Sequence, residues 1–382
     1  MDLETFSFSK TDGWSQDFPA IDSDQTLLVA FGAPAFSKST LPLTELAGAF
    51  PRSHVLGCST AGEFIGDDLR DDSIVVAALR FESTRLRTAD IEPVSSAGCS
   101  FAAGKGIAES LADPSLRAVL LLSDGLAVNG SELVKGLREA LPPSVIATGG
   151  LAADGDRFQH TWILDDMEPR GGAVSAVGLY GDDLRVGHGS KGGWDIFGPE
   201  RTITRSHENV LFELDGRPAL SLYKEYLGDL AADLPASGLL FPLALRSEHP
   251  DGDSIVRTIL AVEENDEALV FAGDMPEGAR AQLMRANFDR LVEGAAGAAE
   301  MTGCSSWPEA PTLALGISCV GRRLVLGERA EEEIESTLDS LSPDVQQIGF
   351  YSYGEISPQG AGSCELHNQT MTLTTISEAP VA

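Results

Sequence analysis

Two short segments of the chain combine a hydroxyl, a glycine and a carboxylate at the same spacing. They are Gly57-x-x-Thr60-x-Gly62-Glu63 and Gly349-x-x-Ser352-x-Gly354-Glu355. Each follows an apolar run typical of a buried strand, and glycine permits a sharp turn that leaves backbone N–H groups free to meet a ligand. We interpret these segments, called elbows below, as parts of a small-ligand site. In the alternative interpretation the glycines only make turns and the glutamates cap the loops.

Aromatic residues at the second elbow extend this interpretation. If the strand continues through it, Tyr351, Tyr353 and Glu355 share one face and Ser352 lies on the other. Two phenols and a carboxylate on one face could hold an ammonium or hydroxyl group. In the alternative, the two tyrosines only pack over a neighbouring strand.

Isolated acids and a thiol are further candidates. Cys58 could act as a nucleophile if a base activated it, but His54 lies four residues earlier on the same predicted strand, too far to be an obvious base. A thiol-dependent hydrolase is therefore kept as a third alternative, and a buried, unreactive cysteine is the simpler interpretation. Asp124 and Asp154 each follow a predicted strand and could be ligand-binding or simply turn residues.

The histidines do not have zinc-site spacing, but they leave a haem site open. None of the six belongs to an H-E-x-x-H motif. Haem needs an axial ligand, for which His188 and His367 are the candidates, although a lone histidine is more often structural. Residues 187–192 spell G-x-G-x-x-G, but the following Gly-Trp-Asp-Ile-Phe-Gly-Pro cannot form the helix that a dinucleotide fingerprint requires.

Composition excludes several classes of function. The 382 residues carry a formal net charge of −31, and no basic stripe is present, which argues against nucleic-acid and anionic-membrane binding. We find neither a signal peptide nor an apolar run long enough to span a bilayer. The five cysteines lack the spacing of a disulfide framework or a zinc site. We therefore expect a cytoplasmic protein.

Hydrophobic patterning predicts alternating strands and helices. The length favours two domains, and the stretch 228–238 is the best boundary, giving residues 1–228 and 239–382. We expect helices over residues 99–112, 131–141, 218–227, 276–301 and 331–341. We also expect a hairpin formed by residues 173–180 and 184–188 around Gly181-Asp-Asp183.

An internal repeat supports the fold class. Residues 313–376 repeat the order of strand, helix, strand, elbow and strand of residues 25–81. We predict an α/β protein of two related lobes with mixed sheets, helices packed on their faces, and a ligand site at strand-end loops or between the lobes.

The chain resembles the FIST proteins, with a FIST N-terminal domain followed by a FIST C-terminal domain. The matching segments are residues 57–63, 123–125, 149–155, 213–220, 349–358 and 366–373, of which the last two are the most specific. One departure is Ala153, where the family pattern leads us to expect glycine, so the geometry of that loop could differ. The ligand-binding candidates, taken from the elbows and these segments, are Cys58, Ser59, Thr60, Glu63, Asp124, Gly150, Asp154, Tyr351, Tyr353, Glu355, His367 and Asn368.

The resemblance implies an intracellular, non-enzymatic sensor of small ligands. The chain leaves no room for an output domain after its last predicted strand, so we expect it to signal to a separate protein such as a histidine kinase or a cyclase. Some stand-alone FIST proteins resemble haem-binding nitric oxide sensors that regulate histidine kinases, and this alternative stays open. We further expect Glu355→Ala to weaken ligand binding while the fold persists.

Overall fold

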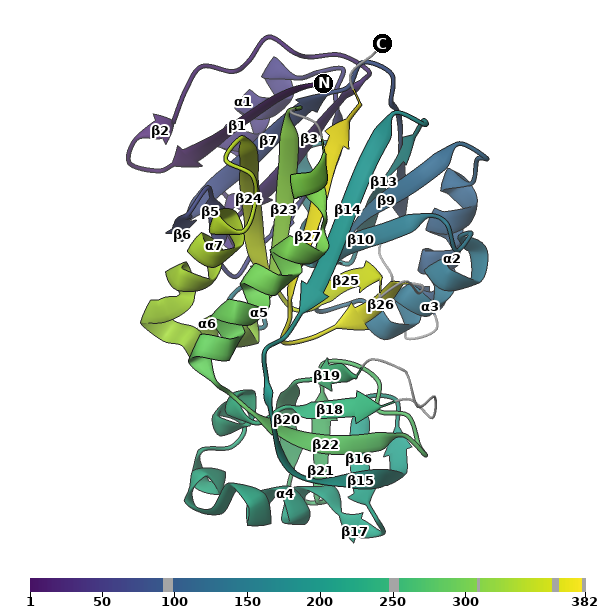
Figure 1. Cartoon of the computed structure of the whole chain (residues 1–382), viewed down its shortest axis with the longest axis vertical. Helices are drawn as coiled ribbons and strands as arrows, with labels where there is room; N and C mark the ends of the chain where they lie inside the picture. Colours follow the sequence, from purple (N-terminus) through teal and green to yellow (C-terminus); the bar gives the residue numbers. More distant parts are fainter. Residues whose placement is uncertain (92–98, 247–253, 308–309, 359–363, 380–382) are drawn as a thin grey trace.

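Long apolar runs become strands that are buried on both faces, as expected for sheets covered on each side. The computed structural model describes residues 1–91, 99–246, 254–307, 310–358 and 364–379. Figure 1 shows two domains, a large α/β body and a smaller domain of mainly β structure beneath it. The predicted mixed α/β class with two domains is confirmed.

The α/β body consists of three units with one topology. In each unit a strand is followed by a helix, a parallel strand, a short hairpin and an antiparallel strand that returns beside the first. The sequence repeat revealed units one and three, and unit two was missed. Both elbows consequently lie in one body and not in two lobes, so that part of the prediction is wrong.

Unit one begins at the N-terminus. Its elements are β1 (Asp2–Ser9), β2 (Gly13–Trp14), β3 (Thr26–Gly32), the 3-10 helix η1 (Pro34–Ser37), α1 (Leu41–Ala49), β4 (His54–Ser59), the hairpin β5 (Glu63–Ile65) and β6 (Asp68–Arg70), and β7 (Ser73–Arg80).

Unit two follows directly. Its elements are β8 (Arg85–Ile91), α2 (Cys99–Leu111), β9 (Leu116–Ser123), α3 (Gly130–Ala140), β10 (Ile146–Leu151), the hairpin β11 (Ile163–Asp165) and β12 (Glu168–Arg170), and β13 (Val174–Tyr180).

Unit three is split in sequence by the small domain. Its elements are β14 (Leu184–Lys191), α5 (Phe288–Met301), η4 (Cys304–Ser306), β23 (Thr312–Cys319), α6 (Val320–Leu326), η5 (Gly327–Arg329), α7 (Ala330–Asp339), β24 (Val345–Ser352), the hairpin β25 (Glu355–Pro358) and β26 (Cys364–His367), and β27 (Met371–Glu378).

Each hairpin completes the sheet of another unit. The sheet orders are β12-β11-β4-β3-β7-β1-β2, β26-β25-β10-β9-β13-β8 and β14-β27-β23-β24-β5-β6. Unit one therefore lends its hairpin to unit three, unit three to unit two, and unit two to unit one. This closed exchange links the three units in a ring.

The small domain is inserted between β14 and α5. Its elements are β15 (Asp195–His207), β16 (Val210–Leu214), β17 (Arg217–Pro218), α4 (Ala219–Leu227), η2 (Gly228–Asp233), η3 (Ala236–Leu240), β18 (Leu243–Arg246), β19 (Ile255–Arg257), β20 (Ile259–Glu263), β21 (Ala268–Phe271) and β22 (Arg280–Arg285). The sheet order is β19-β18-β22-β15-β16-β21-β20, with β17 beside β16. The domains predicted from the sequence, residues 1–228 and 239–382, do not coincide with the two domains in space. Residues 228–238, the predicted boundary, lie inside the small domain.

Two predicted elements are wrong. The stretch 276–301 is not one helix, because buried Ala281 and Leu283 alternate with more exposed neighbours in β22, and Asn287 then caps α5. Residues 173–180 and 184–188 do not form a hairpin, because β13 pairs with β8 and β9 whereas β14 pairs with β27 in another sheet. The other four predicted helices are confirmed within two residues.

The main core lies where the three sheets face one another. Alternate residues of the central strands point inward, and Phe31 of unit one packs on Phe350 of unit three with ring centroids 4.5 Å apart. The opposite faces pack on the helices. Because both faces are covered, the strands show little alternation of polar and apolar residues in sequence.

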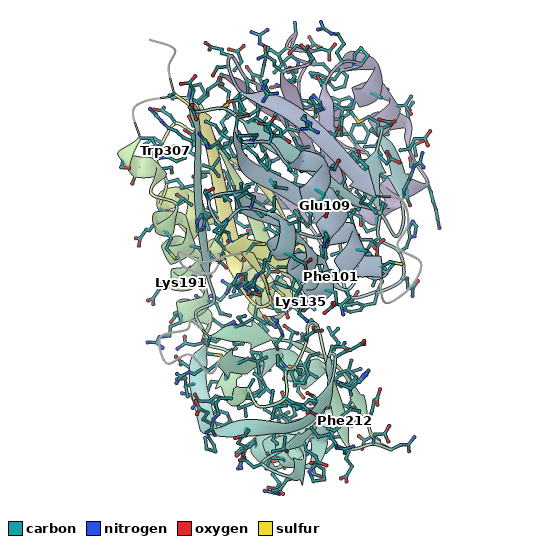
Figure 2. All side chains as sticks on the ribbon, turned by 90° about the vertical axis from the view of Figure 1, so that its right-hand side faces the viewer. Phe101, Glu109, Lys135, Lys191, Phe212 and Trp307 are labelled. Carbon is teal, nitrogen blue, oxygen red and sulfur yellow. The ribbon has the colours of Figure 1, made fainter. Side chains whose placement is uncertain are left out.

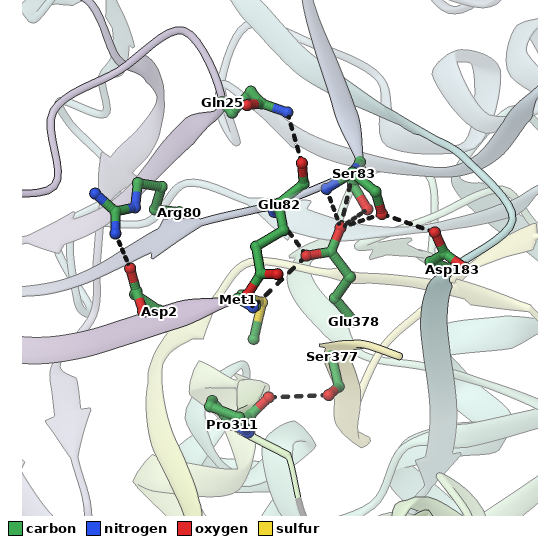
Figure 3. Close-up of polar contacts among 11 residues, drawn as sticks. Met1, Asp2, Gln25, Arg80, Glu82, Ser83, Asp183, Pro311, Ser377 and Glu378 are labelled. Atoms are coloured by element: carbon green, nitrogen blue, oxygen red, sulfur yellow. Dashed lines mark hydrogen bonds and ion pairs between the residues drawn. The ribbon is translucent and has the colours of Figure 1, made fainter. Parts of the chain in front are cut away.

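The last strand is tied to the N-terminal unit by one carboxylate, shown in Figure 3. Glu378 accepts hydrogen bonds from the backbone N–H groups of Glu82, Ser83 and Thr84 at 2.7–2.9 Å. These bonds lower the pKa of Glu378 to about 2, against the opposing effect of burial. The Met1 ammonium lies 3.6 Å from the same carboxylate.

Candidate functional site

All three units make the same backbone exchange where their second parallel strand ends. One residue of each unit donates its N–H to a carbonyl of a neighbouring unit, and its own carbonyl accepts from another N–H of that same neighbour. The pairs are Ser59 N to Trp162 O and Ala153 N to Ser59 O, Tyr351 N to Gly62 O and Ala61 N to Tyr351 O, and Leu151 N to Gly354 O and Tyr353 N to Leu151 O, at 2.8–3.1 Å. The two elbows read from the sequence therefore have a third counterpart.

The first elbow buries its glutamate. Glu63 is fully buried and accepts hydrogen bonds from Thr60 Oγ1 at 2.6 Å and from both N and Oγ of Ser73 at 2.7 Å. Burial raises the pKa of Glu63 to about 7, although these donors oppose the shift. The carboxyl group ties the elbow to the start of β7.

The second elbow repeats this arrangement. Glu355 is fully buried and accepts from Ser352 Oγ at 2.7 Å and from N and Oγ1 of Thr370 at 3.2 and 2.8 Å. Burial raises its pKa to about 8. The prediction that Ser352 and Glu355 lie on opposite faces is wrong, because β24 ends at Ser352 and β25 begins at Glu355, so the alternation of one strand does not continue.

The third elbow has the same backbone without the polar groups. The backbone hydrogen bonds place Ala152 where the other units have the hydroxyl residue and Ile163 where they have the glutamate. Ala173 takes the place of Ser73 and Thr370 at the start of the return strand. All three are buried. Ala153 adopts a backbone conformation outside the positive-φ region, so the missing glycine causes no strain there.

The remaining polar candidates of the first two units are engaged by the protein. Asp124 accepts from the N–H groups of Leu126, Ala127 and Gly172 at 2.8–2.9 Å, as a turn residue would. Asp154 accepts from the N–H groups of Gln159 and His160 at 2.9 Å, and Tyr353 donates its hydroxyl to it. These bonds shape loops.

Cys58 lies in the core in an environment unlike that of an activated nucleophile. Its side chain is fully buried, and burial raises the pKa of the thiol well above its ordinary value. Its neighbour Ser59 uses its hydroxyl to accept from Trp162 N at 3.0 Å. The geometry therefore gives no support to a hydrolase built on Cys58.

A cavity of about 1200 Å³ lies between the α/β body and the small domain. The body contributes the loops that follow β9, β23 and β24, and the small domain contributes η3 and the ends of β20 and β21. Figure 2 shows Lys135 at the end of the body that faces the small domain, and Phe212 within that domain. Loops at strand ends and domain junctions are common places for ligand sites.

Two predicted residues line this cavity, Tyr353 and Asn368. Tyr353 stacks on Phe158, with ring centroids 4.7 Å apart and planes 10° apart. The other ten do not line the cavity: Cys58, Ser59, Thr60, Glu63, Asp124, Gly150, Asp154, Tyr351, Glu355 and His367. Tyr351, for example, is buried and donates its hydroxyl to Ala330 O at 3.3 Å.

Sequence reasoning missed the contribution of the small domain. Thr258, Phe271 and Asp274 line the cavity, but no motif marks them in the sequence. The rim is apolar, because Leu126, Phe158, Leu260 and Leu324 line the cavity and are each more than 40% exposed.

The two histidines proposed as haem ligands lie elsewhere. His367 is buried, and its Nε2 lies 3.1 Å from Ser357 O, while burial lowers its pKa to about 4. His188 lies on β14, which packs against α5, and burial lowers its pKa too. The described lining of the cavity contains no histidine, lysine or arginine, so it offers neither an imidazole ligand nor a cation for haem propionates.

Among the residues that the structure describes, no group of three or more acidic, histidine or cysteine side chains could hold a metal ion. No helix built from them combines the length and the apolarity needed to span a bilayer.

Comparisons with known proteins cover nearly the whole chain. A model of the FIST N domain matches residues 26–217, and a model of the FIST C domain matches residues 219–358. A curated relative, "Uncharacterized protein MJ1623" of Methanocaldococcus jannaschii, is 26% identical over 275 residues, which cover 64% of this chain and 50% of the relative. The chain therefore spans about half the length of that relative.

Two solved structures align over nearly their full lengths, with low similarity. A chorismatase has a TM-score of 0.37 and 10% identity, with 98% of each chain covered. A cyanuric acid hydrolase from A. caulinodans has a TM-score of 0.39 and 8% identity, with 99% of each chain covered.

Proposed function

Because the chain belongs to the FIST family, we propose that it is a sensory protein that binds a small ligand in the cavity between its two domains. FIST domains are generally associated with sensing small ligands in signal transduction. The observation that carries the proposal is the cavity, which is large, mainly apolar, and built from both domains. Closing the small domain over a ligand would bury the exposed rim and thereby change the shape of the protein.

The connections between the domains suit such a movement. The chain crosses at Gly192 and Gly193 after β14 and returns between β22 and α5, so both connections lie at the same side of the body, as Figure 1 shows. Gly193 has a φ of 97°, a conformation that favours glycine.

One buried arginine links these connections to the cavity wall. Arg322 donates to Gly192 O at 2.5 Å and to Leu291 O at 2.8 Å, and it pairs with Glu333 at 2.8 Å, with both side chains fully buried. Its helix α6 lines the cavity through Val320, Gly321, Leu324 and Val325. A ligand that moves α6 would therefore shift the groups that hold both connections.

The proposed output is contact with a separate signalling protein, such as a histidine kinase or a cyclase, that distinguishes the open from the closed form. We keep the prediction that the protein is not itself an enzyme. Neither the haem alternative nor the hydrolase alternative is favoured by a specific observation, because none of His188, His367 and Cys58 lines the cavity.

A library screen by thermal shift tests ligand binding directly, since a ligand at a hundred times its Kd stabilises the folded state by about 2.7 kcal/mol. Ala236 is exposed and lines the cavity, so Ala236→Trp should obstruct part of it. Ala232 is exposed, lies outside the lining and provides the matched control Ala232→Trp. We expect hits that shift the wild type and the control but not Ala236→Trp, and that reduce the radius of gyration in small-angle scattering.

The opposite pattern would count against the proposal. Hits that bind Ala236→Trp as tightly as the wild type would lie outside the cavity. Cavity binding with no change in the radius of gyration would refute closure as the signal.

A further inference from the structure

The cavity wall contains polar groups that the protein leaves without partners. Asn368 has an exposed fraction of 0%, yet neither its side-chain nitrogen nor its side-chain oxygen has a hydrogen-bond partner in the described structure. Thr258 Oγ1, on the small-domain side of the same cavity, is also buried and unpartnered. Because a buried polar group without a partner destabilises the fold, those unpartnered groups that also line the cavity are candidates to bond a ligand there.

The carboxamide of Asn368 presents one donor and one acceptor side by side. The complementary group is another amide, whose N–H can donate to Asn368 Oδ1 while its C=O accepts from Nδ2. A carboxylate could use only Nδ2 and would place its negative charge beside Oδ1. An ammonium group could use only Oδ1. Of these three groups, only the amide satisfies both atoms.

The charges around the cavity also oppose an anion. The described lining includes Asp156, Glu208 and Asp274 and no basic residue. Two cations lie behind the wall, and both are engaged. Arg257 donates to Asp274 O at 3.2 Å and to Leu366 O at 3.0 Å, and Lys135 pairs with Asp274 at 2.7 Å.

We propose that the cavity takes an uncharged, largely apolar amide and discriminates against the corresponding carboxylate. This assignment rests on the proposed function and names its ligand class. The amide meets Asn368, and the apolar part lies against the surfaces of Tyr353, Phe158 and Phe271. An aromatic group suits this wall, because Phe158 and Tyr353 already form a stack.

Three compounds that differ only in their polar group test the assignment on the full chain. They are 3-phenylpropanamide, 3-phenylpropanoate and 3-phenylpropan-1-amine, measured by isothermal titration calorimetry at one pH and ionic strength. We expect the amide to bind at least about tenfold more tightly than either other compound, since a hydrogen bond lost from a buried group costs on this order. A carboxylate or amine that binds as tightly as the amide overturns the assignment.

Variants of Asn368 locate the selectivity. Asn368→Leu should abolish the preference for the amide and, because it removes two unpartnered polar atoms, raise the melting temperature of the ligand-free protein. Asn368→Ala and Thr258→Val provide second variants if the leucine does not fit. Asn287→Leu is the matched control: Asn287 caps α5 outside the cavity, so its loss should lower the melting temperature and leave the amide preference intact. An amide preference that survives in both Asn368 variants contradicts the assignment.

The tryptophan variants separate this inference from the sensor proposal. If the carboxylate binds as well as the amide and Ala236→Trp abolishes both, the amide assignment fails and the sensor proposal stands. If the amide binds Ala236→Trp as tightly as the wild type, both fail. If none of the three compounds binds, the assignment fails, and the library screen decides on the sensor.

Discussion

The three elbows of the α/β body share one backbone arrangement but have two chemistries. Units one and three bury a glutamate, Glu63 or Glu355, that collects three hydrogen bonds from a hydroxyl and from the start of the return strand. Unit two makes the same backbone exchange with Ile163 between Ala152 and Ala173. The carboxyl group is therefore not needed to form the turn.

Because the turn forms without a carboxyl group in unit two, Glu63 and Glu355 are expected to contribute to stability and not to ligand binding. Both carboxyl groups are fully buried, take their hydrogen bonds from the protein itself and do not line the cavity, so we expect them to affect stability and its pH dependence. The apolar elbow shows which partners must change together: the hydroxyl, the acid and the strand-start residue. Exchanging the chemistry of one unit for that of another tests this interpretation.

The largest effect should come from placing the acid in the apolar unit. Ile163→Glu would bury a carboxyl group between Ala152 and Ala173, which have no side-chain donor for it. Burying an unpaired charge costs about 3–5 kcal/mol. We expect the urea midpoint to fall accordingly, with Ile163→Val, at about 1 kcal/mol, as the control. A loss no larger than that of the control would contradict the comparison.

Removing an acid from a polar unit should have the next largest effect. Glu355→Ala leaves the donors of Ser352 and Thr370 buried without an acceptor, so we expect a loss of about 3 kcal/mol in the free energy of unfolding. This differs from the expectation drawn from the sequence, in which the fold persists and binding weakens. Exposed Glu4→Ala serves as the control. Unchanged stability together with weaker ligand binding would restore the earlier interpretation.

The two acids should also make stability depend on pH. Their pKa values in the folded protein, about 7 for Glu63 and about 8 for Glu355, lie above the ordinary value of 4.5. The folded state therefore holds protons that the unfolded state has released, and stability falls as pH rises toward 8.

The clearest window runs from pH 6.5 to 8. At lower pH, the depressed pKa of His367, about 4 against 6.5, acts in the opposite direction, and Glu378 responds only below pH 4.5. We expect a loss of about 1–2 kcal/mol across the window by urea titration. The double variant Glu63→Gln and Glu355→Gln should flatten the curve, and an equally steep curve would show that other groups cause it.

The smallest effect should be a rescue. Glu63→Ile alone leaves Thr60 and Ser73 without an acceptor, whereas adding Thr60→Ala and Ser73→Ala reproduces the composition of unit two. We expect the triple variant to be about 1 kcal/mol more stable than Glu63→Ile, because matched apolar groups replace unsatisfied donors. Strictly additive losses across the three substitutions would argue against the equivalence of the units.

The sequence allowed the strand and helix content and two elbows to be predicted, because buried strands and amphipathic helices have local patterns. Unit two was missed because its elbow lacks the hydroxyl and the glutamate of the other two and its loop is longer. The hairpin predicted around Gly181 has suitable turn residues, but its two strands belong to different sheets. Strand pairing between distant segments has no local signal.

The site was predicted only in part for a similar reason. Tyr353 and Asn368 lie in the distinctive C-terminal motif and do line the cavity. Glu63 and Glu355 drew attention as acids near glycines, although their spacing to Thr60 and Ser352 serves an internal hydrogen bond. Thr258 and Phe271 line the cavity because the small domain packs against the body, and no local pattern in the sequence indicates that packing.

The exchanged hairpins also constrain how the chain can fold during synthesis. The sheet of unit two is complete only after β25 and β26 have been synthesised. β14 can pair only with β27, which ends at Glu378. Until then a nascent chain exposes the edges of β10 and β14 to other strands. The ribosome must therefore deliver the chain as far as Glu378 before the body can close, which makes late folding, and a need for protection from aggregation until that moment, part of the architecture.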